Sequence, residues 1–186
     1  MPKITEARVL FIATHGFEQS ELEKPLDDLK AQGAAVTVAT LDGNSIRGWD
    51  EDDWGNTVEA DAQIEAVSET DFDALVIPGG QINPDLLRVE DSVLKLVRAF
   101  HNAGKPIAAV CHAPWVLIEA GILSGRDATS FKSIATDVKN AGANWKDKEV
   151  VVDQAIITSR NPGDLDAFVS KIVEEIEEGR HSRRAA

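Results

Sequence analysis

The chain has 186 residues, 43% of them hydrophobic, and its 32 acidic and 19 basic residues give a net charge of −13. This length suits one domain with its own core, and the apolar content excludes a disordered chain. The acidic balance disfavours nucleic acids and anionic membranes as partners, because both are negatively charged.

Short apolar runs alternate with amphipathic segments along the chain, beginning with a buried strand over residues 7–13. A helix over residues 21–32 and a strand over 35–40 follow, with Gly33 as a natural helix stop. We expect, in order, a long loop or small hairpin over 41–56, a strand over 72–77, a helix over 91–102, a strand over 106–110, helices over 113–120 and 134–141, two strands over 149–152 and 155–158, and an amphipathic helix over 163–178.

This alternation predicts an α/β fold in which a mainly parallel sheet is covered by helices on both sides. Such sheets bind ligands beyond the carboxyl ends of their strands. Residues 14–18, 79–85 and 111–112 each follow a predicted strand and are therefore expected at the site. We expect a single domain over residues 1–179 and a flexible basic tail over 180–186. Apolar runs are no longer than strands and the N-terminus resembles no signal peptide, so we expect a cytoplasmic protein.

The single cysteine, Cys111, stands where a buried strand passes into a helix. A lone cysteine is more often an inert buried residue than a nucleophile. Here, however, Pro114 suits the first turn of a helix, and a sharp strand-to-helix turn is the layout of a nucleophile elbow. The positive end of that helix favours a thiolate, so the pKa of Cys111 is expected to be lowered.

Several residues at the same strand ends fit a role beside Cys111. His112 is a candidate base, although a histidine at a helix start also serves as a cap. The backbone N–H groups of Gly79, Gly80 and His112 are candidates for an oxyanion hole, although Pro-Gly is also a common turn. Glu18 is a candidate carboxyl partner for the thiol, although an acid near a helix start also complements the helix dipole.

The sequence predicts neither a metal nor a cofactor. The histidines His15, His101, His112 and His181 lack the spacing of metal ligands, and one cysteine builds no metal cluster. Neither a dinucleotide fingerprint nor a phosphate loop is present.

Four segments together resemble the PfpI-type proteins of the parkinsonism-associated deglycase superfamily. They are Ala109-Val-Cys-His-Ala-Pro-Trp115, Leu75-Val-Ile-Pro-Gly-Gly80, Phe17-Glu18 and Thr158-Ser-Arg-Asn-Pro-Gly163. The resemblance implies a flavodoxin-like three-layer sandwich, similar to class I glutamine amidotransferases, that forms homodimers or larger oligomers. It also implies Cys111 as nucleophile, His112 as neighbouring base and Glu18 as the carboxyl group that tunes the thiol.

In the family an acid after the Gly-Gly turn reaches the histidine of an adjacent subunit. Asp85 is the matching residue here, although it is an aspartate in place of glutamate and its segment is one residue longer. The family's activities are those of a peptidase, a cofactor-free glyoxalase, a deglycase and a chaperone-like stress protein.

Three hypotheses for the function follow. The first is an enzyme that acts on small reactive carbonyls such as methylglyoxal, in stress protection. The second is an intracellular cysteine peptidase that needs Asp85 from a second subunit. The third is a redox sensor or chaperone without turnover, in which peroxide oxidises an exposed thiolate. A glutamine amidotransferase is disfavoured because no His-x-Glu pair occurs late in the chain.

Overall fold

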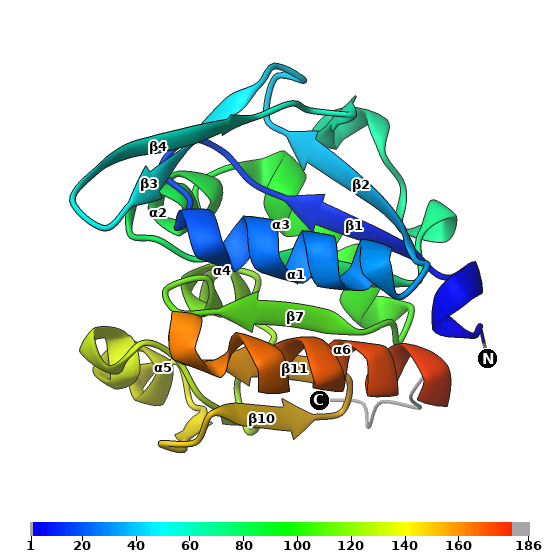
Figure 1. Cartoon of the computed structure of the whole chain (residues 1–186). Helices are drawn as coiled ribbons and strands as arrows, with labels where there is room; N and C mark the ends of the chain where they lie inside the picture. Colours follow the sequence, from blue (N-terminus) through cyan, green and yellow to red (C-terminus); the bar gives the residue numbers. More distant parts are fainter. Residues whose placement is uncertain (1, 180–186) are drawn as a thin grey trace.

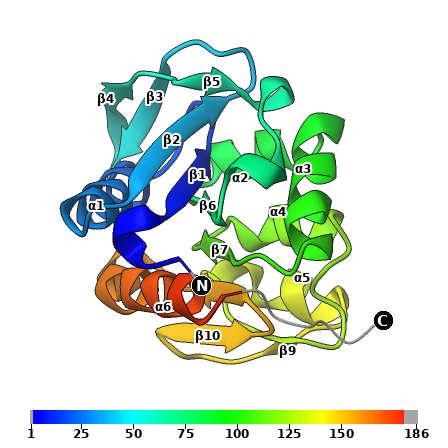
Figure 2. The ribbon, with the colours of Figure 1, turned by 90° about the vertical axis from the view of Figure 1, so that its right-hand side faces the viewer.

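The computed structural model describes residues 2–179 and contains one large sheet between two layers of helices (Figures 1 and 2). The predicted tail over residues 180–186 lies outside the described residues. The sheet order is β10 (Val150–Asp153), β11 (Ile156–Ser159), β7 (Ile107–Val110), β6 (Ala74–Ile77), β1 (Arg8–Ile12), β2 (Ala35–Thr40) and β5 (Ala62–Gln63). All neighbours pair in parallel except β10 and β11, which confirms the expected α/β fold.

The helices divide between the two faces of the sheet. In Figure 2, α1 and α6 lie on one side, and α2, α3, α4 and α5 lie on the other. Their bounds are α1 (Gln19–Ala31), α2 (Ile82–Leu87), α3 (Asp91–Asn102), α4 (Pro114–Glu119), α5 (Ala135–Asn140) and α6 (Leu165–Glu178). The 3-10 turns are Ile4–Glu6, Ile64–Ala66, Glu69–Asp71, Lys132–Ile134 and Pro162–Asp164. None of the described helices is long and apolar enough to cross a bilayer.

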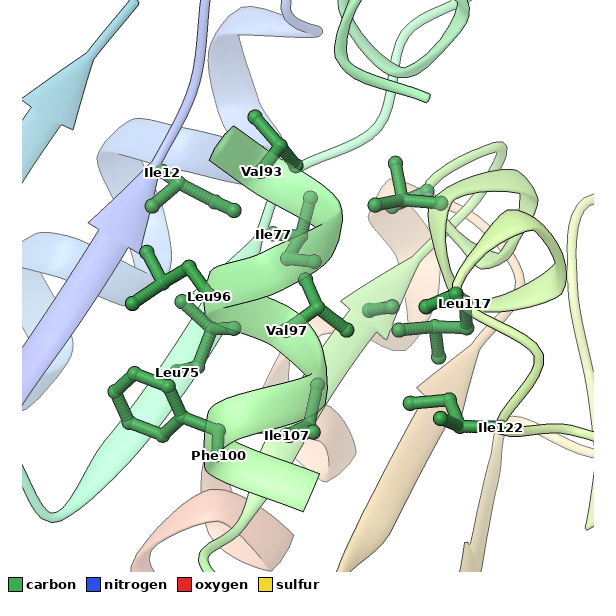
Figure 3. Close-up of a cluster of buried hydrophobic side chains, with 14 of the residues drawn as sticks. Ile12, Leu75, Ile77, Val93, Leu96, Val97, Phe100, Ile107, Leu117 and Ile122 are labelled. Atoms are coloured by element: carbon green, nitrogen blue, oxygen red, sulfur yellow. The ribbon is translucent and has the colours of Figure 1, made fainter. Parts of the chain in front are cut away.

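The two cores follow from the alternation of side chains along buried strands. In β1, Leu10 and Ile12 enter the core under α3, whereas Val9 and Phe11 enter the core under α1 and α6. Successive strand residues point to opposite faces, so a strand covered on both sides must be apolar throughout. Figure 3 shows the first core, in which α3 packs its apolar face on the sheet.

The segment expected to be a long loop or small hairpin is a hairpin. It consists of β3 (Ile46–Asp50) and β4 (Asp53–Val58), which pair antiparallel and project above the main sheet (Figure 1). A further short pair joins β8 (Asp127–Ala128) to β9 (Asn144–Trp145). The α2 helix was not predicted, because six residues containing Asn83 and Pro84 look like a loop in sequence.

The hairpin is hydrogen-bonded to the start of α1 and to the residue Phe17 before it. The Trp49 backbone N–H donates to Phe17 O at 2.7 Å, and the Asn56 backbone N–H donates to Gln19 Oε1 at 2.6 Å. Gly48 faces the Phe17 ring, where an added Cβ would lie 2.9 Å from a ring carbon. The hairpin tip is therefore held beside the carboxyl ends of the central strands.

Candidate active site

Cys111 occupies a strained turn immediately after β7. Its φ is 64°, a left-handed conformation that costs a non-glycine residue free energy and is found where the surroundings enforce it. The Cys111 N–H donates to Ser159 O at 3.0 Å, and its carbonyl accepts from the Phe131 N–H at 2.7 Å. These bonds hold the predicted elbow in place, and Cys111 is only 5% exposed.

His112 bends alongside the thiol, as the elbow geometry predicts. Its Nδ1 lies 3.1 Å from Cys111 Sγ, and its Nε2 lies 3.1 Å from Ser133 Oγ. The ring stacks on Phe131 at 4.8 Å between centroids and meets Trp115 edge-on at 5.2 Å. Burial lowers the pKa of His112, so the neutral ring dominates at neutral pH. A neutral ring that donates from Nε2 to Ser133 leaves Nδ1 able to accept the thiol proton.

The carboxyl group beside Cys111 belongs to Glu21, which corrects the expectation for Glu18. Glu21 lies in the first turn of α1 with 0% exposure, and its Oε2 accepts from the Gly79 N–H at 2.9 Å. Its other oxygen, Oε1, is buried with no hydrogen bond of standard geometry among the described residues, while the carboxyl group interacts with the Cys111 thiol beside it. Glu18 precedes the helix with an extended backbone, and its carboxylate reaches Ser20 at 3.5 Å. It still lines the same pocket.

The pKa values of Glu21 and Cys111 depend on each other. Burial, followed by repulsion from Glu18, raises the pKa of Glu21 to about 8. Burial, followed by the negative charge of Glu21, also raises the pKa of the Cys111 thiol. This direction is opposite to the expected one. The reason is that the turn is buried and faces an acid, whereas α4 has only six residues and starts at Pro114.

The backbone N–H groups of Gly80 and His112 stabilise the thiolate, and they partly offset the rise in the pKa of Cys111. Both were expected to form the oxyanion hole. Gly79, also expected there, instead donates its N–H to Glu21. The absence of a side chain at Gly79 allows close packing, because an added Cβ would lie 2.4 Å from Glu21 Oε2 and 2.6 Å from Cys111 Cβ.

Asp85 is not brought to His112 within one chain. It is exposed in the first turn of α2 and does not line the pocket around Cys111. The buried neighbour Asn83 has a structural role: its Oδ1 accepts from the Thr14 N–H at 2.7 Å and its Nδ2 donates to Pro78 O at 2.8 Å. Asn83 thereby joins the loops after β1 and β6.

These side chains meet in a pocket of about 440 Å³. It is lined by Gly16, Glu18, Glu21, Trp49, Glu51, Gly80, Gln81, Ile82, Cys111, His112, Phe131 and Pro162. Sequence reasoning missed Ser133 and Phe131, which reach the site only because the segment after β8 folds back over the elbow. Within residues 2–179, no three histidine, cysteine, aspartate or glutamate residues are grouped to hold a metal ion.

The family model described as the DJ-1/PfpI family matches residues 7–175. The protein named deglycase TK1284 from Thermococcus kodakarensis is 42% identical over 166 residues, covering 89% of this chain and 97% of its own length. The Escherichia coli protein named protein/nucleic acid deglycase 2 is 40% identical, covering 87% and 92%. The crystal structure of Drosophila melanogaster DJ-1beta superposes with a TM-score of 0.83 at 32% identity, covering 96% and 95%. This chain therefore belongs to the DJ-1/PfpI family.

Proposed function

We propose that this chain is a cofactor-independent, cysteine-dependent enzyme that converts small reactive carbonyl compounds, such as methylglyoxal, to 2-hydroxy acids in stress protection. The observation that carries the proposal is the trio at the bottom of the pocket. A thiol lies 3.1 Å from a neutral histidine and beside a buried carboxyl group with a pKa of about 8. A pKa near the working pH suits a group that both takes and returns a proton.

The first step adds Cys111 Sγ to the aldehyde carbon while the thiol proton passes to His112 Nδ1. The new oxyanion is stabilised by the N–H groups of Gly80 and His112, which already face the sulfur. The oxyanion then takes up a proton, and the product is a hemithioacetal on Cys111.

The second step moves a proton between the two substrate carbons. Glu21 removes the proton from the carbon bonded to sulfur, and a proton is returned to the neighbouring carbon. The first carbon is thereby oxidised while the second is reduced, so no external oxidant is needed, and the product is a thioester of the 2-hydroxy acid. Water adds to this thioester and releases the acid and the free thiol.

The test is to incubate the protein with methylglyoxal and assay each lactate enantiomer. We expect a single enantiomer from the wild type and none above background from Cys111→Ala or Glu21→Gln. Glu18→Gln is the comparison that separates the two glutamates. Activity lost in Glu18→Gln but kept in Glu21→Gln would return the proton-transfer role to Glu18. Absence of lactate from the folded wild type would overturn the proposal.

A peptidase is the alternative that the exposed position of Asp85 favours. Asp85 shares α2 with the exposed apolar side chains of Ile82 and Leu86, and the exposed Val89 follows this helix. A second copy packed on this apolar face would therefore bring its own Asp85 close to it. Casein hydrolysis that is lost in Asp85→Asn, and that follows an oligomer in gel filtration, would support this alternative.

A redox sensor is less well supported. Peroxide reacts with thiolates, and the buried Cys111 has a raised pKa. Stepwise oxygen addition at Cys111 in intact mass spectra at low peroxide would favour the sensor over the carbonyl enzyme.

A further inference from the structure

The outer part of the pocket is negatively charged, although the chemistry proposed for methylglyoxal requires no charge there. Glu18 is half-buried and Glu51 is exposed at the hairpin tip, and both line the pocket above Cys111. Burial raises the pKa of Glu18, and the negative charges of Asp50 and Glu51 raise it further. Among the described residues that line the pocket, none is lysine or arginine.

These carboxylates are held close together by the fold. Trp49 pairs with Glu18 through a β-bridge, and its indole Nε1 donates to the Glu51 carbonyl at 2.9 Å. The Trp49 ring also meets Trp54 edge-on at 5.6 Å, which stiffens the tip. Like charges fixed near one another repel, and a bound cation relieves that repulsion.

Two further features of the pocket suit a cation. Trp49 and Phe131 line it, and aromatic faces attract ammonium groups. At the bottom, the buried Glu21 lines the same pocket, and its Oε1 has no hydrogen-bond partner of standard geometry among the described residues. Arg47 and Arg160 are engaged elsewhere: Arg47 donates to the carbonyls of Trp54 and Gly55, and Arg160 pairs with Asp147 and Asp164.

We propose that this site selects small carbonyl compounds that carry a positive charge, with Glu51, Glu18 and Trp49 receiving the cationic group while the carbonyl carbon lies at Cys111. This inference rests on the proposed carbonyl chemistry and specifies its substrate class. Anionic carbonyl compounds, such as 2-oxo acids, are disfavoured by the same field.

Charged thiol reagents test the field without requiring turnover. Cys111 is the single cysteine of the chain, so the cationic 2-(trimethylammonio)ethyl and anionic 2-sulfonatoethyl methanethiosulfonates label one site. The rate at which each reagent labels Cys111 is followed by intact mass. The ratio of the cationic rate to the anionic rate is then divided by the same ratio measured for the protein unfolded in urea. Changes in the reactivity of the thiol itself cancel in this ratio.

We expect the folded wild type to favour the cationic reagent by about tenfold or more over the unfolded reference at low salt. Glu51→Gln should lower this preference by about threefold, Glu51→Lys should lower it further, and ~1 M salt should remove most of it. Asp27→Lys is the matched control: it makes the same charge change on an exposed α1 position outside the pocket and should keep the preference within about twofold. A wild-type preference near that of the unfolded chain, or one that Glu51→Lys leaves intact, would overturn the inference.

A second experiment separates this inference from the proposed function. Betaine aldehyde, a cationic aldehyde, and glyoxylate, an anionic one, are compared as inhibitors of lactate formation from methylglyoxal. Stronger inhibition by betaine aldehyde supports the inference, and stronger inhibition by glyoxylate overturns it. If the wild type forms no lactate but shows the reagent preference, the proposed function fails and the cationic site stands. If the wild type forms lactate without the reagent preference, the proposed function stands and the cationic site fails.

Discussion

Replacing Glu21 with glutamine should stabilise the protein at alkaline pH while it removes the proposed activity. The folded protein holds the Glu21 proton up to a pKa of about 8, whereas the ordinary value for the unfolded chain is 4.5. Between these values the folded state binds more protons than the unfolded state. Its free energy of unfolding therefore decreases as the pH rises from 4.5 to 8.

The difference between the two pKa values of Glu21 corresponds to a loss of about 5 kcal/mol in the free energy of unfolding, at ~1.4 kcal/mol per pH unit. Glutamine has nearly the same shape as glutamate and carries no charge. Its carbonyl oxygen can still accept the hydrogen bond that the Gly79 N–H donates to Glu21 at 2.9 Å. The variant should thus match the wild type near pH 4.5 and exceed it by up to about 5 kcal/mol above pH 8.

Urea unfolding of both proteins at intervals from pH 5 to 9 measures this difference, since the other titrating groups are common to both. Glu18→Gln is the matched control, because its carboxylate is only half-buried and should leave a much smaller pH-dependent difference. Parallel stability curves for wild type and Glu21→Gln would refute the argument that Glu21 is buried with a raised pKa.

Three further predictions follow from the geometry. Ser133→Ala removes the partner of His112 Nε2 and should lower kcat/KM about fivefold, with a shifted acidic limb in the pH–rate profile; an unchanged profile would deny Ser133 an orienting role. Gly79→Ala places a Cβ 2.4 Å from Glu21 Oε2 and should cost about 2 kcal/mol or more in urea unfolding, whereas a cost below ~0.5 kcal/mol would contradict the packing. Cys111→Gly should be about 1 kcal/mol more stable than Cys111→Ala, because glycine tolerates the φ of 64°; equal stability would mean the turn is unstrained.

Sequence patterns predicted the sheet and most helices because each pattern is local. Residues 35–40 and 91–102 were predicted with the bounds that β2 and α3 have, since an apolar run between turn residues and an amphipathic period depend on near neighbours alone. The elbow at Cys111 was likewise readable from a strand, a proline and a helix in succession. Weak or short signals failed, as for α2, where Pro84 in the first turn of a short helix looks like a loop residue.

The sequence by itself determined the fold class, the family and the pairing of Cys111 with His112, because these depend on motifs and on residues adjacent in the chain. Only the tertiary structure decided which carboxyl group meets the thiol. Glu18 and Glu21 differ by three residues around the start of α1, and a helix start turns one inward and leaves the other in the outer part of the pocket. The same holds for the raised pKa of Cys111 and for the contact of Ser133 with His112. Burial and contacts between distant segments arise from packing, which no local pattern of residues encodes.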